Sequence, residues 1–436
     1  MEDFDIVLGE QEIWGGGRAP FGLLAPDRRR GLYIIGQTGV GKSSLIRSMV
    51  RQDMERGRGC ILIDPHGDLA EEVLADVPSN RVRDTMLIDP GDEEHVISIN
   101  PFYRVAKNDR AIVTNNLVSA FRHIWHDNWG STRLQYILTN VIAALLDAPD
   151  YLRPTLLSVP LVLANEHYRA RVVKAIEDPQ VRHFFEAEFA NWSERYLSEA
   201  LGPIQNRIGQ FLVNPTLRNM LGQWRPAIDF RSILERARIL IVRLSKGLIG
   251  EEPANLLGSL IVASIQSAAM YRARIPEKDR SDIPLYIDEF QSITSTASTT
   301  VFAEGRKYGL MLTVAHQYLS QLQDDVRAAI FGNVGSMVAF RVGAEDAPMI
   351  AEQIGTYHAR NYRDLPIGEV YARMLVKGES TSEFRGATIP RSGGSPTRAK
   401  KIRSWCHEEH CRRREEVEEE IVGWLQHPWI RGEKRL

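Results

Sequence analysis

A glycine-rich stretch near the N-terminus has the residue types and spacing of a phosphate-binding loop. Residues 36–43 fit G-x-x-x-x-G-K-[ST] at every fixed position, after an apolar, β-branched run at residues 32–35. Residues 44–55 have a helical pattern, so a buried strand would lead through a tight turn into a helix N-terminus, where backbone N–H groups and the helix dipole favour an anion. The alternative is a chance match or a glycine-rich turn without a ligand, and the flanking pattern argues against it.

The loop and the start of its helix supply the candidate nucleotide-binding residues. Lys42 would reach the β- and γ-phosphates of ATP, and the Ser43 hydroxyl would ligate Mg²⁺. The residues expected to bind the nucleotide are Gly36, Thr38, Gly39, Val40, Gly41, Lys42, Ser43 and Ser44.

Two adjacent carboxylates, Asp288 and Glu289, follow the apolar run of residues 285–287. A buried strand would deliver both to the carboxyl edge of a parallel sheet, where open α/β sheets bind ligands. We expect Asp288 to belong to the Mg²⁺ shell and Glu289 to polarise the attacking water as general base. An acidic pair after a strand often only caps the next helix, and the phosphate-binding loop favours the catalytic interpretation.

Three further side chains are candidates for the same site. Gln317 follows the strand pattern of residues 310–314. Its side chain could sense the γ-phosphate or orient the water, because an amide both donates and accepts hydrogen bonds. The alternative is an amide in a loop without a catalytic role. Arg306 is predicted on a helix between the two strands, as an arginine finger that serves a neighbouring subunit or as a solvated helix residue. Arg341, after a later strand, is a second candidate for that role.

Two other motifs leave their alternatives open. His66 and Asp68 follow the strand pattern of residues 60–63 and would support the water or the metal shell, or simply form a turn. The run Cys406-His407-Glu408-Glu409-His410-Cys411 suggests zinc. On one helix, residues 406 and 410 share one face and residues 407 and 411 another, so the four side chains cannot close one tetrahedral site and no metal is expected. Pairing between molecules is the one arrangement that could restore a metal site.

The amino-acid composition indicates the general class of protein. The 436 residues are 43% hydrophobic and 25% charged, which is ordinary for a soluble globular protein. The formal charge of −2 argues against a basic nucleic-acid coat but not against a local basic channel. Three cysteines, an acidic N-terminus and no apolar run of about 20 residues predict a cytoplasmic protein without a disulfide framework, a secretory signal or a membrane span of its own.

The order of patterns predicts an α/β fold with a mainly parallel sheet. Residues 1–104 would hold N-terminal strands and the first half of the P-loop core, and residues 105–230 an all-α insertion. Residues 231–390 would complete the core, and residues 391–436 would form a linker and a charged helical tail.

Taken together, these motifs resemble the HerA/FtsK superfamily of ring ATPases, and within it the chain is most similar to the TraG/TraD-like coupling proteins of conjugation and type IV secretion. The resemblance covers roughly residues 5–390. It rests on the phosphate-binding loop, residues 63–68, 286–291 and 315–317, and on residues 202–222, 244–247 and 331–335.

The resemblance implies a RecA-like core, a hexameric ring and ATP-driven movement of single- or double-stranded DNA through a central pore. It also implies that the α-insertion contacts DNA or a partner such as a relaxase, a nuclease or a secretion component. Membrane-bound coupling proteins carry N-terminal transmembrane helices, which are not evident here, so we expect a soluble translocase in DNA processing, mobile-element transfer or defence. The alternative is an ATPase that handles or recruits proteins for a secretion or defence complex.

Overall fold

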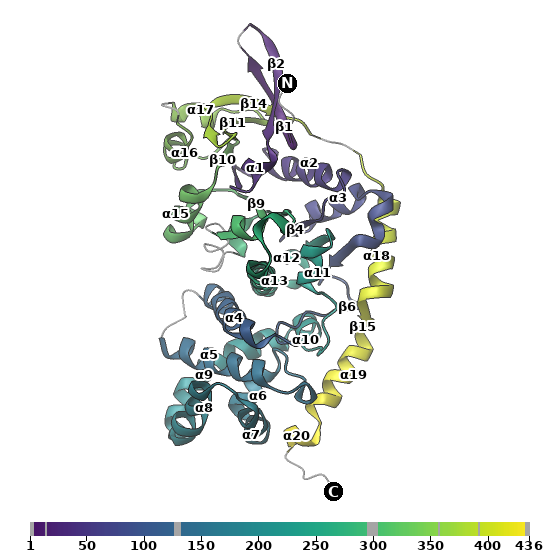
Figure 1. Ribbon diagram of the computed structural model, residues 1–436, viewed down its shortest axis with the longest axis vertical. Helices are drawn as coiled ribbons and strands as arrows, with labels where there is room; N and C mark the ends of the chain where they lie inside the picture. The colour runs from purple at the N-terminus through teal and green to yellow at the C-terminus, as the bar shows by residue number, and fades with distance from the viewer. Residues whose placement is uncertain are drawn as a thin grey trace. The chain divides into compact units, whose positions relative to one another are not determined.

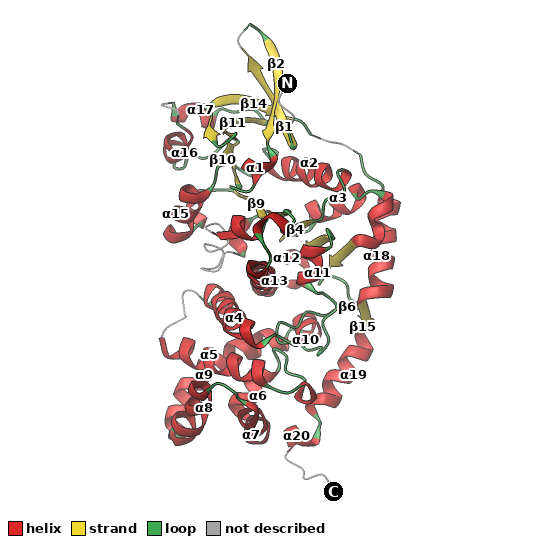
Figure 2. Cartoon of the chain, viewed as in Figure 1, coloured by secondary structure: helices red, strands yellow, loops and turns green. Residues whose placement is uncertain are grey.

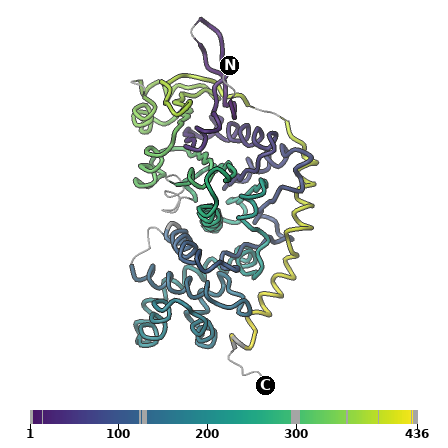
Figure 3. Tube along the Cα trace, viewed as in Figure 1, coloured from purple at the N-terminus to yellow at the C-terminus, as the bar shows by residue number. Residues whose placement is uncertain are grey.

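The computed structural model describes residues 4–13, 15–125, 132–293, 304–355, 358–390 and 393–431. The chain forms two compact units, each assembled from three segments. The sheet unit comprises residues 1–88, 230–245 and 268–406, and the helical unit comprises residues 89–229, 246–267 and 407–436. Figure 3 follows the three segments of the helical unit in blue, teal and yellow. The first two linker residues, 391 and 392, lie outside the described part of the chain.

The sheet unit is built on an 11-stranded sheet with the order β2-β1-β14-β11-β10-β3-β9-β8-β4-β7-β5. Its strands are β1 (Ile6–Ile13), β2 (Gly17–Leu23), β3 (Leu32–Ile35), β4 (Cys60–Asp64), β5 (Thr85–Ile88), β7 (Ile239–Arg243), β8 (Ile283–Ile287), β9 (Leu310–His316), β10 (Ser336–Ala339), β11 (Glu369–Arg373) and β14 (Phe384–Thr388). The small hairpin of β12 (Leu375–Val376) and β13 (Glu379–Ser380) accompanies it.

From β10 to β5 every pairing in this sheet is parallel, which confirms the predicted mainly parallel core. The strands β3, β4 and β8 are buried along their whole length, as expected where helices cover both faces. Strands β11, β14, β1 and β2 extend the sheet with antiparallel pairs, and β1 and β2 form the purple hairpin in Figure 1.

Helices lie between the strands of the sheet unit and after its last strand. They are α1 (Ala25–Arg28), α2 (Lys42–Glu55), α3 (Asp68–Asp76), α11 (Phe230–Glu235), α15 (Asp324–Asn333), α16 (Ala347–Ile354), α17 (Ala359–Arg363) and the larger part of α18 (Pro396–His410), with the short η1 (Ser79–Asp84), η7 (Arg272–Arg274), η8 (Glu277–Asp279), η9 (Phe290–Ser292), η10 (Gly305–Tyr308) and η11 (Leu319–Gln321). Apolar residues of α2, α3 and α18 pack into one core with the strands.

The helical unit is almost entirely α-helical (Figure 2). Its helices are α4 (Arg110–Ile124), α5 (Thr132–Asp147), α6 (Ser158–Ala164), α7 (Glu166–Ala175), α8 (Pro179–His183), α9 (Glu194–Val213), α10 (Pro215–Leu221), α12 (Lys246–Ile249), most of α13 (Glu251–Tyr271), α19 (Arg414–Leu425) and α20 (Pro428–Arg431), with the short η2 (Lys107–Asp109), η4 (Asp150–Leu152), η5 (Phe184–Glu188) and η6 (Phe189–Asn191). Two short strands, β6 (His95–Ile97) and β15 (Cys411–Arg413), pair antiparallel within this unit.

Among the residues that the structure describes, one helix is long and apolar enough to cross a membrane by length and composition alone. It is α13 together with η7, Glu251–Arg274, and 72% of its most apolar window is buried inside the protein. The core helix of a globular protein has the same properties, so this helix is weak evidence for a membrane span.

Candidate active site

Parallel pairing brings the carboxyl ends of four strands to one edge of the sheet. The last residue of β3, Ile35, pairs with His316 of β9 and with Ala339 of β10. At the end of β8, Ile287 pairs with Val314 of β9. The segments that follow these strands therefore meet at one edge, and they carry the phosphate-binding loop, the two carboxylates, Gln317 and Arg341.

The phosphate-binding loop leads directly into α2. Gly39 and Gly41 have φ values of 77° and 117°, in the left-handed region that favours glycine. Gly41 is the N-cap of α2, no side chain caps the helix, and its first turn holds no acidic residue. The N-terminal N–H groups of α2 therefore have no competing side-chain acceptor, which suits a phosphate group.

The eight predicted nucleotide-binding residues lie together at this turn. Thr38, Gly39, Ser43 and Ser44 are exposed, so their polar groups are accessible to a ligand. Gly36 is buried, and a Cβ there would lie 2.6 Å from the Cβ of Phe340, which explains the need for glycine. The remaining three, Val40, Gly41 and Lys42, lie in the same turn and are buried or partly buried.

Lys42 is buried and folds back on its own loop. Its Nζ donates hydrogen bonds to the carbonyl oxygens of Gly36 at 2.7 Å and Gln37 at 2.9 Å. Burial lowers the pKa of Lys42, and the negative charges of Asp288 and Glu289 act in the opposite direction. The loop thus holds the ammonium group at the place where it would meet a phosphate.

Asp288 lies against the start of α2. The Ser43 hydroxyl donates a hydrogen bond to its Oδ2 at 2.8 Å. Burial raises the pKa of Asp288 to about 6; the hydrogen bond from Ser43 opposes this rise, and the charges of Asp64 and Glu289 add to it. A buried carboxylate beside two other acids is an oxygen ligand that a divalent cation would stabilise.

Glu289 is held by two amide side chains. Gln317 donates its Nε2 proton to Oε1 at 2.7 Å, and Gln291 donates to Oε2. Glu289 itself has a φ of 46°, an unusual value for a residue with a side chain. Such strained residues concentrate at functional sites. The structure therefore brings Gln317 and Glu289 together, and it adds Gln291, which the sequence analysis missed although the Glu-x-Gln spacing was visible.

A buried polar network fastens the P-loop helix to the strand that carries the carboxylates. Asp53 of α2 is fully buried and accepts two hydrogen bonds from Arg28, at 2.8 and 2.6 Å. Tyr286, two residues before Asp288, donates its hydroxyl proton to Asp53 as well. Because α2 starts at Lys42, this network fixes the distance between the loop and Asp288.

Arg306 lies away from this cluster. It is exposed on η10, a 3-10 helix rather than an α-helix, just before the first residue of β9. Gln317 follows the last residue of the same seven-residue strand, and seven residues span roughly 20 Å. Arg306 therefore lies at the opposite edge of the sheet from its own phosphate-binding loop, and its role as an arginine finger for a neighbouring subunit stays a prediction.

Arg341 and Asp64 lie at the candidate site itself. Arg341 donates its Nε proton to the side-chain oxygen of Gln37 in the loop at 3.3 Å, so it faces the site of its own chain. Asp64 accepts hydrogen bonds from the backbone N–H groups of His66 and Ala70, both at 2.9 Å. The Asp64 carboxylate thus holds the turn into α3, whereas the side chains of His66 and Asp68 are exposed.

The run of cysteines and histidines does not gather at one point. Cys406 is buried, with its Sγ 3.5 Å from the carbonyl oxygen of Thr85. His407 instead approaches Asp92, with Nε2 and Oδ2 2.8 Å apart. The helix ends at His410, and Cys411 begins a strand, so the single helix assumed for this run is wrong at its last residue.

Comparisons with known proteins agree with this geometry. Residues 27–103 match the family described as helicase HerA, central domain, and residues 282–369 match the family described as the TraM recognition site of TraD and TraG. The two matched segments contain the phosphate-binding loop and the carboxylates with Gln317. No curated protein sequence matches the chain.

Solved structures share the fold. The unbound bacterial conjugative coupling protein TrwBdeltaN70 has a TM-score of 0.64 and 16% identity over 91% of each chain. TrwB with ADP and Mg²⁺ has a TM-score of 0.63 and 16% identity, covering 92% of this chain and 98% of its own. VirB4 of Thermoanaerobacter pseudethanolicus has a TM-score of 0.54 and 15% identity, over 91% and 99%.

A RecA-like sheet with a phosphate-binding loop, and a carboxylate pair at its carboxyl edge, defines a nucleotide-binding P-loop ATPase. The two family matches, to the helicase HerA central domain and to the TraM recognition site of TraD and TraG, agree with a resemblance to HerA/FtsK-type ATPases of the TraG/TraD-like group. The predicted resemblance is confirmed.

Proposed function

We propose that this protein is an ATP-hydrolysing DNA translocase that works as a ring and is related to conjugative coupling proteins. The grouping of Lys42, Asp288, Glu289 and Gln317 at one sheet edge carries the ATPase part of the proposal. The helicase HerA match and the shared fold with a coupling protein support DNA as the substrate.

The site residues fit ATP with Mg²⁺. Ser43 and Asp288 offer only oxygen donors, which Mg²⁺ prefers, and they already touch each other. When bound, the cation would neutralise charge on the β- and γ-phosphates. The raised pKa of Asp288 supports this assignment, because burial and the charges of Asp64 and Glu289 outweigh the hydrogen bond from Ser43 and the charge of Lys42, so a cation would stabilise the carboxylate further.

Four side chains of this protein would then have separate roles in hydrolysis. Lys42 would exchange its hydrogen bonds to two carbonyl oxygens of the loop for hydrogen bonds to the phosphates. Glu289 would take the proton of the attacking water, and Gln317 would orient Glu289 and report the γ-phosphate. Gln291 would hold the second carboxylate oxygen of Glu289 in place. We assign these roles from the positions of the side chains at the edge of the sheet.

Arg306 supports assembly into a ring, expected to be a hexamer. Its position at the far edge of its own sheet fits a guanidinium that completes the site of the next subunit. Each round of hydrolysis would then require two subunits, which is how a ring passes a conformational change from one subunit to the next.

The proposed substrate is DNA held through its phosphate backbone, so binding would be charge-based and insensitive to sequence. We assign the helical unit the role of contacting DNA or a partner such as a relaxase, a nuclease or a secretion component, and we place the protein in the cytoplasm. The match named for TraM recognition favours one second function, an ATPase that handles or recruits proteins for a secretion or defence complex.

The rate of ATP hydrolysis with and without DNA tests the proposal. We expect single- or double-stranded DNA to raise the rate severalfold at low salt, and we expect the stimulation to fall as salt rises, because counterion release drives backbone binding. Hydrolysis that neither kind of DNA stimulates, in intact oligomers at low salt, would contradict a DNA motor and favour the protein-handling function.

A further inference from the structure

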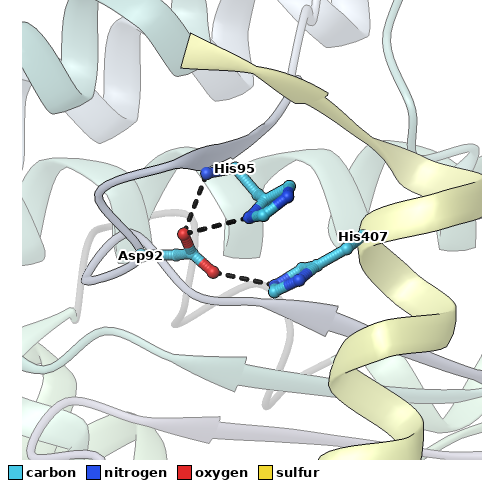
Figure 4. Close-up of side chains that lie close together, drawn as sticks. All are labelled: Asp92, His95 and His407. Atoms are coloured by element: carbon cyan, nitrogen blue, oxygen red, sulfur yellow. Dashed lines mark hydrogen bonds and ion pairs between the residues drawn. The ribbon is translucent and has the colours of Figure 1, made fainter.

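Asp92, His95 and His407 form a cluster within the helical unit that takes no part in the nucleotide site. Each residue has a ligand atom within 4.8 Å of those of the other two. Nε2 of His407 lies 2.8 Å from Oδ2 of Asp92, and Nδ1 of His95 lies 3.6 Å from Oδ1 (Figure 4). Both imidazoles thus direct a ring nitrogen at the same carboxylate.

The fold brings these residues together from segments more than 300 positions apart in the sequence. His95 begins β6, and Asp92 lies in the turn before it. His407 lies in the last turn of α18, and the chain then enters β15, which pairs with β6 in antiparallel register. That pairing fixes the end of α18 beside the turn that contains Asp92.

Backbone hydrogen bonds orient the carboxylate before any ligand arrives. Oδ1 of Asp92 accepts N–H bonds from Glu94 at 3.0 Å and from His95 at 2.8 Å. Oδ2 faces His407. The carboxylate is therefore fixed in the way that hydrogen-bonded metal ligands usually are.

The three side chains are neither buried in a core nor free in solvent. Their exposed fractions are 21% for Asp92, 22% for His95 and 29% for His407. An ion could therefore reach them from solvent.

We propose that Asp92, His95 and His407 bind a divalent transition-metal ion, with Zn²⁺ the best fit. Two imidazole nitrogens and one carboxylate oxygen form a donor set of the kind that Zn²⁺ takes, whereas Mg²⁺ prefers oxygen donors alone. Three protein ligands leave the fourth tetrahedral position to water.

Binding requires a modest rearrangement. The two rings stack in this structure, with centroids 3.9 Å apart and planes 7° apart, so their in-plane lone pairs point in parallel. Ligand atoms of a tetrahedral zinc site lie about 3.3 Å apart, given zinc–ligand distances of about 2.0–2.1 Å. Rotation of the rings about χ2, a broad and soft torsion, brings both nitrogens onto one ion.

The bound ion would fasten the end of α18 to the turn before β6. The short β6–β15 pairing alone joins only three residues on each strand. A metal bridge would therefore stabilise the attachment of the C-terminal segment, α19 included, within the helical unit.

The test is metal binding by the full chain, stripped with chelator, freed of any affinity tag and kept free of nucleotide. Titration with Zn²⁺ by calorimetry, and with Co²⁺ by the visible absorption of a tetrahedral site, should show one ion per chain. His407→Asn and His95→Asn should each weaken binding at least tenfold. The matched control His410→Asn, on the same helix but outside the cluster, should bind as the parent does.

The result is independent of the ATPase proposal. Asp288→Asn removes a ligand of the proposed Mg²⁺ site and should leave the Co²⁺ signal unchanged. Failure of the ATPase proposal and failure of the proposed Asp92–His95–His407 site can therefore be told apart. No binding of Zn²⁺ or Co²⁺ by the parent chain would overturn the site. Equal metal binding by the parent chain and by a folded His407→Asn variant would also overturn the site. Loss of the Co²⁺ signal in Asp288→Asn, with the signal kept in the histidine variants, would overturn it as well. Asp92→Asn provides a second test if a histidine variant does not fold.

Discussion

Replacement of Glu289 by glutamine is expected to lower kcat for ATP about 10²- to 10⁴-fold while ATP still binds with nearly unchanged affinity, because the variant loses a general base but no phosphate contact. The substitution should preserve the structure. Gln317 and Gln291 both donate to the carboxylate, and one of them can turn its amide to present oxygen to the new NH₂ group.

Steady-state turnover and equilibrium binding of a fluorescent ATP analogue measure the two effects separately. Glu352→Gln provides a matched control, because Glu352 is exposed on α16. Normal turnover by Glu289→Gln would refute the role of Glu289 as base. A large loss of ATP affinity would assign it to nucleotide binding instead.

Replacement of Arg306 by alanine is expected to reduce turnover about 100-fold or more, since arginine fingers stabilise charge that develops in the transition state. The defect should appear in kcat with little change in ATP binding to isolated subunits. The neighbouring Lys307→Ala, on the same exposed η10, should have a much smaller effect.

Mixing two inactive variants tests whether Arg306 acts between subunits. Lys42→Ala lacks a working phosphate-binding loop but keeps Arg306, and Arg306→Ala has the reverse defect. Mixed oligomers should regain activity at interfaces where an intact loop meets an intact arginine. No recovery in demonstrably mixed oligomers would contradict action in trans, and it would direct attention to Arg341, which contacts the loop of its own chain.

Local patterns were sufficient to predict much of the sheet and its carboxyl edge. The strand at Leu32–Ile35 has the bounds expected from its apolar run, and the loop that follows turns into α2 as expected. Parallel topology then places the ends of β3, β8 and β9 at one edge, so Ser43 with Asp288, and Glu289 with Gln317, could be grouped from sequence. The catalytic roles of these residues stay predictions.

Contacts between distant segments could not be predicted in this way. Nothing in residues 92–95 indicates that α18 will end beside them, because that depends on the β6–β15 pairing of two three-residue strands. The antiparallel extension by β11, β14, β1 and β2 also depends on tertiary pairing rather than on local pattern. For the same reason the sequence alone groups His407 with its neighbours in the chain rather than with Asp92.

Displacement of streptavidin from end-biotinylated DNA tests the central claim, that ATP hydrolysis moves this protein along DNA. With ATP, we expect the parent chain to release streptavidin from single- or double-stranded DNA, and we expect Glu289→Gln to release none although it binds ATP. If the parent chain hydrolyses ATP on both kinds of DNA but releases streptavidin no faster than the Glu289→Gln variant does, the protein is not a DNA translocase.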